Sequence, residues 1–184
     1  MRLLGVDFTS APGRRKPIVV AHGTLRGDEL RLAHIEALED WQAFEAFLAR
    51  SGPWLGGFDF PFGLPREAVS DLGWPRAWEG LVRHCVSLGR SGFRAALDGH
   101  RESRPAGRRY AHRATDYPAR SHSPLKLVNP PVALMFLEGA PRLLDATLAM
   151  MQAGACARAD APGFGLPPEI DPLEGWLATV PRGA

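Results

Sequence analysis

The chain has 184 residues, a net charge of +2, an apolar fraction of 45% and a charged fraction of 23%, which are ordinary values for one soluble globular domain. No apolar run approaches the roughly 20 residues that a membrane-spanning helix needs, and we do not expect the first ten residues, "MRLLGVDFTS", to be a signal peptide. The two cysteines, Cys85 and Cys156, have no paired spacing, so neither a zinc site nor a disulfide is indicated. We therefore expect a cytoplasmic protein with reduced core cysteines.

Three strands are expected at the start of the chain. Residues 2–7, "RLLGVD", form a short apolar run that ends in an acid, which is typical of a buried strand. Residues 17–25, "PIVVAHGTL", are rich in β-branched side chains. Residues 29–38, "ELRLAHIEAL", alternate apolar and polar side chains as a half-buried strand does. Together these segments predict a meander.

A helix and a fourth strand are expected next. Within residues 39–52, "EDWQAFEAFLARSG", four apolar side chains share one helical face: Trp41, Phe44, Phe47 and Leu48. Asp40 can cap the start of this helix, and Gly52 can end it. Residues 54–60, "WLGGFDF", are predicted to form the fourth strand.

The remainder of the chain is predicted to be mainly helical. Short helices are expected at 65–73 and 75–89, because each begins with a proline and stops at a glycine. A weaker helix at 91–102 is interrupted by Gly99. Later features are a long loop at 103–126, a strong helix at 141–159 and a tail rich in proline and glycine at 160–184.

The order of the first five elements indicates the fold class. A meander, a crossover helix and a fourth strand place the first and fourth strands side by side and parallel, since such crossovers are right-handed. This is the skeleton of a ribonuclease H-like α/β fold with a mixed sheet. We expect a single domain with its core at 1–60 and 141–158, a helical and basic insertion at 61–140, and a tail from 159.

Asp7 and Asp59 each end an apolar strand, in "LLGVDF" and "LGGFDF". Adjacent strands lie about 4.8 Å apart, so the two carboxylates would meet at the carboxyl edge of the sheet. Two ionised carboxylates at that separation repel each other, and Mg²⁺ or Mn²⁺ would offset the charge. Such ions activate water in phosphodiester cleavage. The alternative is that each acid caps a helix or closes a turn.

A third metal ligand is expected at Asp145, in "PRLLDATLAMMQAG". This acid is flanked by leucines at the edge of an apolar helical face, from which it could reach over the end of the sheet. The equal alternative is a surface acid near the start of a helix, where the helix dipole favours a negative charge.

The loop at 103–126 is strongly basic and holds both tyrosines of the chain. Arginines interleaved with aromatic side chains suit phosphate contacts and base stacking, as nucleic-acid binding requires. The candidate binding residues are Arg108, Arg109, Tyr110, Arg113, Arg120 and Lys126. The alternative is a solvated loop that only aids solubility, and the low net charge argues against tight, sequence-independent duplex binding.

Four motifs together resemble the DUF429 family of predicted nucleases with a ribonuclease H-like fold. They are "LLGVDFTSAPGRRKPI", "GPWLGGFDFPFGLPR", "YAHRATDYPA" and "VNPPVALMFLEGAPRLL". The resemblance implies catalytic metal ligands at Asp7 and Asp59, and it suggests Asp145 as the acid of the last helix. It also implies further site residues at Arg113 and Asp116 of "HRATD".

The chain departs from that family at one place. "EGAPRLL" runs directly into "DATLAMMQAG", where family members carry a further segment that includes a fifth strand. Without it the fourth strand becomes a sheet edge with unpaired backbone groups. The resemblance thus implies a shortened member, which is either inactive or pairs through this edge in a homodimer.

Three functions remain open from the sequence. The first is a metal-dependent nuclease that hydrolyses phosphodiester bonds with Mg²⁺ or Mn²⁺. The second is a non-catalytic remnant that binds nucleic acid or protein. The third is a nucleotide-binding phosphotransferase of the actin and sugar-kinase kind, but "DFTSA" lacks the glycine that a phosphate loop needs.

Overall fold

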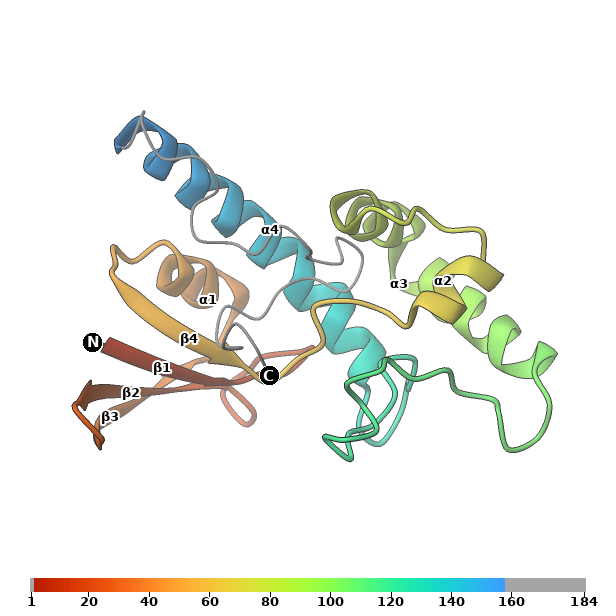
Figure 1. Cartoon of the computed structure of the whole chain (residues 1–184), viewed down its shortest axis with the longest axis horizontal. Helices are drawn as coiled ribbons and strands as arrows, with labels where there is room; N and C mark the ends of the chain where they lie inside the picture. The colour runs from red at the N-terminus through yellow and green to blue at the C-terminus, as the bar shows by residue number, and fades with distance from the viewer. Residues whose placement is uncertain (1, 158–184) are drawn as a thin grey trace. The chain divides into compact units, whose positions relative to one another are not determined.

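The computed structural model describes the backbone of residues 2–157 and the side chains of residues 2–144 (Figure 1). Contacts within the chain divide it into two compact units, of which the first ends at Phe60 and the second begins at Pro61. The expected association of residues 141–158 with the first unit stays a prediction. The first unit contains β1 (Arg2–Asp7), β2 (Ile18–Arg26), β3 (Glu29–Leu38), α1 (Trp41–Leu48) and β4 (Trp54–Phe58).

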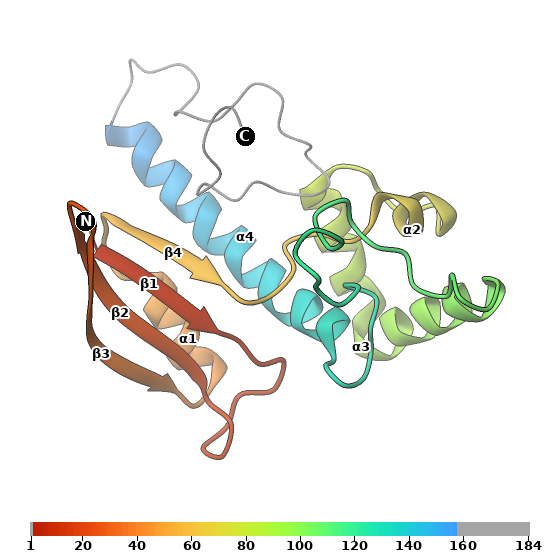
Figure 2. The same cartoon turned by 60° about the horizontal axis from the view of Figure 1, so that its bottom comes forward.

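The first unit is built on a mixed four-stranded sheet in the order β3-β2-β1-β4 (Figure 2). β2 runs antiparallel to both β1 and β3, whereas β4 runs parallel to β1. The predicted meander and the parallel pairing of the first and fourth strands are therefore confirmed. The α/β class is confirmed with them, and the assignment to the ribonuclease H-like fold stays a prediction.

Helix α1 packs against one face of this sheet (Figure 2). It begins as predicted, because the Asp40 carboxylate accepts a hydrogen bond of 2.8 Å from the backbone N–H of Ala43. Its Phe44 and Phe47 are buried, and the ring of Phe44 meets the ring of Phe8 edge-on. The helix ends at Leu48, earlier than the expected stop near Gly52.

Strand β3 forms where it was predicted, but its predicted half-burial is wrong. Leu30, Leu32 and Ile35 are 68%, 65% and 62% exposed. The register shifts between His22 and Gly23, so that Gly23 pairs with Leu32 while His22 pairs with His34, and one extra residue bulges out. The three exposed side chains lie on the face opposite α1, which no other element of the first unit covers.

The second unit contains the helices α2 (Arg66–Asp71), α3 (Trp78–Ser103) and α4 (Val132–Ala157). α2 lies where it was predicted, and Gly73 follows it with a φ of 65°. In α3 the chain kinks at Gly89, where a helix end was expected, but Gly99 does not interrupt the helix. Between Ser103 and Val132 the chain forms no helix or strand, which confirms the long loop.

Helix α4 starts earlier than predicted, at Val132 instead of Pro141. Pro141 therefore lies inside the helix, although it has no backbone N–H to donate to the preceding turn. Side chains on both sides of this position, Ala140 before it and Leu144 after it, are buried in the core of the second unit. That core also contains Leu81, Phe93 and Leu97 of α3.

Two further predictions concern single features. Cys85 is a buried free thiol in the core of the second unit, as expected. Cys156 lies outside the described side chains. Among the described residues, no helix is long and apolar enough to span a membrane.

Candidate functional site

Asp7 and Asp59 stand next to each other at the carboxyl ends of two parallel strands. Asp7 is the last residue of β1, and Asp59 directly follows β4. Val6 pairs with Phe58 in the register of the two strands, and the backbone N–H of Asp59 donates a 2.9 Å hydrogen bond to the carbonyl of Val6. The pairing thus continues up to the acids and brings both to the same edge of the sheet.

Both acids line one shallow, open hollow of about 560 Å³. Its lining comes only from the first unit and consists of Gly5, Val6, Asp7, Val19, Ala21, Gly57, Phe58 and Asp59. Gly5 pairs with both Ala21 and Gly57, so three small residues lie side by side across the sheet. A methyl group added at Gly57 would meet no atom within 4 Å, which shows that the space above this glycine is open.

The two carboxylates are exposed and have no partner among the described residues. Neither side chain forms a hydrogen bond or an ion pair there. The loop after β1 is organised by Thr9 instead, whose hydroxyl accepts a hydrogen bond from the backbone N–H of Ala11. Asp40, in contrast to Asp7 and Asp59, caps helix α1 with its carboxylate. In the described part of the chain, neither Asp7 nor Asp59 therefore makes the side-chain contact by which an acid caps a helix or closes a turn.

Asp145 lies within α4, in the second unit, and its side chain is outside the described residues. The structure thus places this acid on a helix, as the sequence indicated. Its role as a third metal ligand stays a prediction, as does the alternative of a surface acid.

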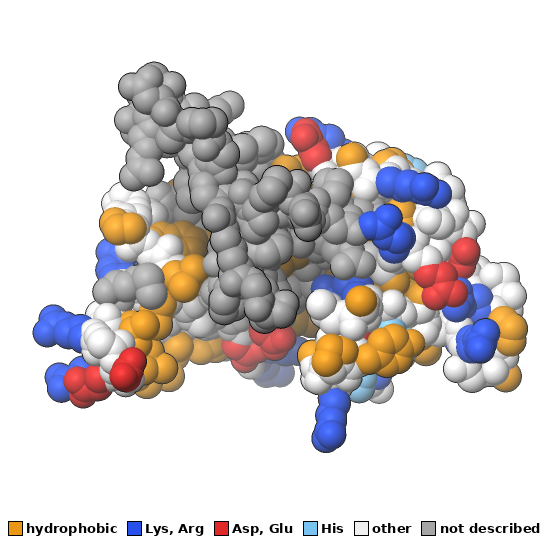
Figure 3. All heavy atoms as spheres, in the orientation of Figure 1, with side chains coloured by type: hydrophobic (Ala, Val, Ile, Leu, Met, Phe, Trp, Pro, Cys, Tyr) orange, Lys and Arg blue, Asp and Glu red, His pale blue; other side chains and the backbone are white. Residues whose placement is uncertain are grey.

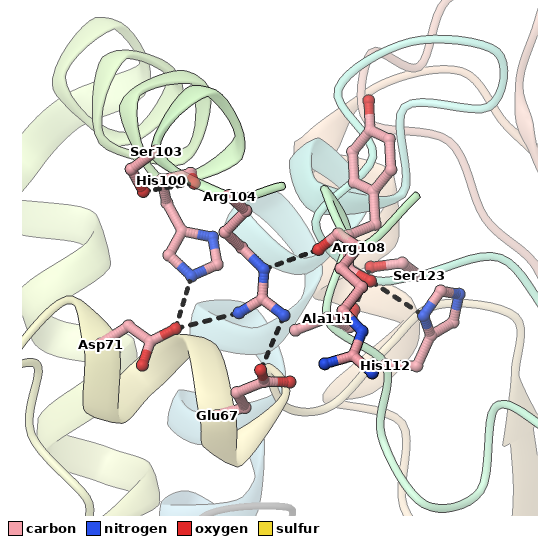
Figure 4. A network of polar contacts seen from close by, with 10 residues as sticks. Glu67, Asp71, His100, Ser103, Arg104, Arg108, Ala111, His112 and Ser123 are labelled. Carbon is pink, nitrogen blue, oxygen red and sulfur yellow. Dashed lines mark hydrogen bonds and ion pairs between the residues drawn. The ribbon is translucent and has the colours of Figure 1, made fainter. Parts of the chain in front are cut away.

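The start of the basic loop has a structural role. The Arg104 guanidinium donates to Glu67 at 2.6 Å and to Asp71 at 3.0 Å, and Asp71 also contacts the ring of His100 at 3.0 Å (Figure 4). The backbone carbonyl of Arg108 accepts a further bond from Arg104. This network connects the loop to α2 and α3, so Arg104 is not available as a phosphate ligand.

Asp116 and Arg113 form an ion pair within the loop. Asp116 is 1% exposed, and its carboxylate accepts hydrogen bonds from the backbone N–H of Arg113 at 2.7 Å and from the Arg113 guanidinium at 2.8 and 3.0 Å. The hydroxyl of Ser121 donates another at 3.1 Å. These contacts give the pair a role in holding the loop's conformation. Their role as site residues stays a prediction.

The other predicted binding residues differ in their exposure and contacts. Arg108, Arg109 and Arg120 are exposed, and among the described residues their guanidinium groups have no acidic partner. The Lys126 ammonium donates to the backbone carbonyl of Asn129 at 2.7 Å, and Tyr110 is half-buried. Figure 3 shows basic side chains distributed over the second unit and interspersed with apolar ones, so they do not form a continuous basic stripe on this face.

A cluster that the sequence interpretation missed lies on the β2–β3 hairpin. His22, His34 and Glu36 each offer one ligand atom, and these atoms lie within 4.8 Å of one another, so the group could hold a metal ion. The only sequence signal is a histidine in one predicted strand and a His-x-Glu pair in the next. That signal does not reveal the register that brings them together.

Comparison with protein-family models, with curated proteins and with solved structures finds no match to this chain. The resemblance to the DUF429 family therefore stays a prediction.

Proposed function

We propose that the protein is a metal-dependent nuclease that hydrolyses phosphodiester bonds at the carboxyl edge of β1 and β4. The observation that carries the proposal is the pair Asp7 and Asp59. These exposed carboxylates lie at the same level at the ends of two adjacent parallel strands, and small residues line the hollow beside them. Ligand sites of open α/β sheets lie at this edge, where the carboxyl ends of the strands meet.

The donor set fits a hard divalent cation. Both candidate ligands are carboxylates, and no Lys or Arg side chain among the described residues neutralises either of them. Carboxylate oxygens suit Mg²⁺ or Mn²⁺. When bound, such an ion supplies Lewis-acid activation of water and stabilises the leaving oxygen. Asp7 and Asp59 would hold it, and the small residues Gly5 and Gly57 leave room for a substrate phosphate beside them.

The topology supports the same proposal. A meander followed by a helix and a parallel fourth strand is the order expected of a ribonuclease H-like core, and the sheet order β3-β2-β1-β4 agrees with it. The exposed Arg108, Arg109 and Arg120 would contact the phosphates of a nucleic-acid substrate. Tyr117, which is 71% exposed and lies beside the ring of His112, offers a stacking surface.

A second candidate function is nucleic-acid or protein binding without turnover. It is favoured by α4, which runs without a break from the "EGAPRLL" motif into "DATLAMMQAG", and by β4, whose outer edge pairs with no described strand. An open edge can accept a strand from another chain, so a homodimer through β4 belongs to this proposal.

A thermal melt with and without Mn²⁺ tests the metal site. We expect Mn²⁺ to raise the melting temperature of the wild type more than that of Asp59→Asn, because an ion that binds only the folded state stabilises it. Asp28→Asn is the matched control, since Asp28 is an exposed acid in the hairpin turn outside the hollow.

Cleavage of a labelled oligonucleotide then separates the two functions. Mn²⁺-dependent cleavage that Asp59→Asn abolishes and Asp28→Asn retains is the result expected of the nuclease. Cleavage that persists in Asp59→Asn contradicts the assigned site. Binding without cleavage, unchanged in Asp7→Asn, would favour the second function.

A further inference from the structure

We propose that His22, His34 and Glu36 form a second metal site, specific for a divalent transition metal of the Zn²⁺ class. It lies on the sheet face that α1 covers, apart from Asp7 and Asp59. His22 pairs with Leu4 of β1, whereas Asp7 pairs with Val19, and side chains alternate between the two faces along each strand. The two acids therefore point to the opposite face from this site.

The ligand atoms already lie close together. The Nε2 atom of His22 is 2.9 Å from the carboxylate of Glu36, and the rings of His22 and His34 stack with centroids 4.2 Å apart and an interplanar angle of 11°. All three ligand atoms fit within 4.8 Å. A tetrahedral zinc ion with bonds of about 2.0–2.1 Å needs ligand atoms roughly 3.3 Å apart. Because the stacked rings hold their nitrogen lone pairs in nearly parallel planes, one imidazole must rotate to bind the same ion, and the exposed His34 has room to do so.

The bulge in β3 creates this arrangement. A regular hairpin register would place Ala33 opposite His22, because Gly23 pairs with Leu32. The register shift places His34 there instead, and Glu36 then follows on the same face, next to His22. Without the extra residue His34 would point to the other face of the sheet. The irregularity thus has a specific chemical result, which is the convergence of two imidazoles and a carboxylate.

The surrounding residues hold two of the ligands in place. The Arg50 guanidinium donates to both oxygens of Glu36 at 2.6 Å and lies over the ring of Phe47. The hydrogen bonds from Arg50 are the main cause that lowers the pKa of Glu36 from its ordinary value. The ring of His22 packs edge-on against Phe47. A partner that orients a metal-binding carboxylate is a common feature of metal sites.

The donor types determine the class of ion. Two imidazole nitrogens and one carboxylate oxygen suit Zn²⁺ and its neighbours, whereas Mg²⁺ and Ca²⁺ prefer oxygen ligands alone. Three protein ligands leave one position for water. In the ion-free protein Glu36 accepts a hydrogen bond from Nε2–H of His22, so binding requires this proton to leave Nε2.

The test is a titration of the full chain with Co²⁺, which stands in for Zn²⁺ because its visible absorption reports nitrogen-rich coordination. The Asp59→Asn background removes the proposed sheet-edge site, and a parallel titration of the wild type in excess Mg²⁺ gives a second measurement. We expect one Co²⁺ per chain in both, displaced by Zn²⁺. This outcome is independent of whether the protein is a nuclease.

His34→Ala is the decisive variant, because His34 is exposed and its side chain forms no hydrogen bond among the described residues. Mutation of a residue that only orients a metal ligand typically weakens metal binding about 10–100-fold. Loss of the ligand His34 should weaken Co²⁺ binding at least as much. The matched control His122→Ala removes an exposed histidine of the loop and should leave binding unchanged. Absence of binding, or equal binding by His34→Ala and its parent, would overturn the proposal and leave the cluster as an ion pair between Glu36 and Arg50.

Discussion

The adjacent glycines Gly56 and Gly57 of β4 should respond in opposite ways to the same substitution. They are neighbours in sequence, but they face opposite sides of the sheet. A Cβ atom added at Gly56 would lie 2.9 Å from ring atoms of both Trp54 and Phe58. A Cβ atom added at Gly57 would meet nothing within 4 Å. Packing against Trp54 and Phe58 therefore requires glycine at position 56. At position 57 a glycine serves only to keep the hollow open.

The magnitude follows from comparing the two variants. Replacing glycine by alanine reduces the entropy of the unfolded chain and stabilises a compatible site by about 0.4–1 kcal/mol. This contribution is the same at both positions and cancels in the difference. Forcing a methyl group against two rings costs about 1–3 kcal/mol. We therefore expect Gly57→Ala to raise the free energy of unfolding by about 0.4–1 kcal/mol and Gly56→Ala to be about 1–3 kcal/mol less stable than it.

Urea unfolding followed by far-UV circular dichroism measures this difference, provided that the denaturant dependence of both variants is the same. Equal midpoints for the two variants would refute the packing argument. Gly57→Val extends the test to function, because a β-branched side chain suits the strand and would fill the hollow. It should keep the stability of the wild type and lose phosphodiester cleavage. Full activity would show that the substrate does not enter this hollow.

Replacing Asp116 with Ala should lower the free energy of unfolding by about 1.5–3 kcal/mol, because it removes charge-assisted hydrogen bonds that hold the loop. An unchanged urea midpoint would contradict this role. Glutamine at the three exposed loop arginines should weaken binding of a single-stranded oligonucleotide and reduce the slope of log K against log salt by about 0.7 for each phosphate that is no longer neutralised. The three substituted residues are Arg108, Arg109 and Arg120. Fluorescence anisotropy at several salt concentrations measures the slope, and an unchanged affinity and slope would exclude the loop from binding. Burial raises the pKa of the Cys85 thiol from 9.0 to about 12. In a Cys156→Ser background, a thiol reagent at pH 8 should therefore modify the protein only as fast as it unfolds, and rapid modification of the folded protein would refute the burial. Because the unfolded thiol ionises first, the free energy of unfolding should also fall between pH 9.0 and about 12, and Cys85→Ala should lack this contribution.

The sequence by itself determined the elements whose causes are local. Asp40 caps α1 because its side chain reaches the N–H of Ala43, three residues away, and no distant contact is needed. The strand order follows from the succession of elements and the handedness of crossovers. That order brings Asp7 and Asp59 to one edge, because each follows an apolar strand. These two residues were therefore predictable as neighbours.

Only the tertiary structure decided the features that depend on register and burial. The periodicity of "ELRLAHIEAL" predicts a strand, but the bulge between Leu32 and His34 sets which face each side chain takes, and this depends on the pairing with β2. The family resemblance of "HRATD" likewise implies a site role for Asp116, but only the structure shows that Asp116 is buried and bonded to Arg113. A one-residue shift or a single buried contact changes the chemistry of a side chain, and neither leaves a trace in local sequence.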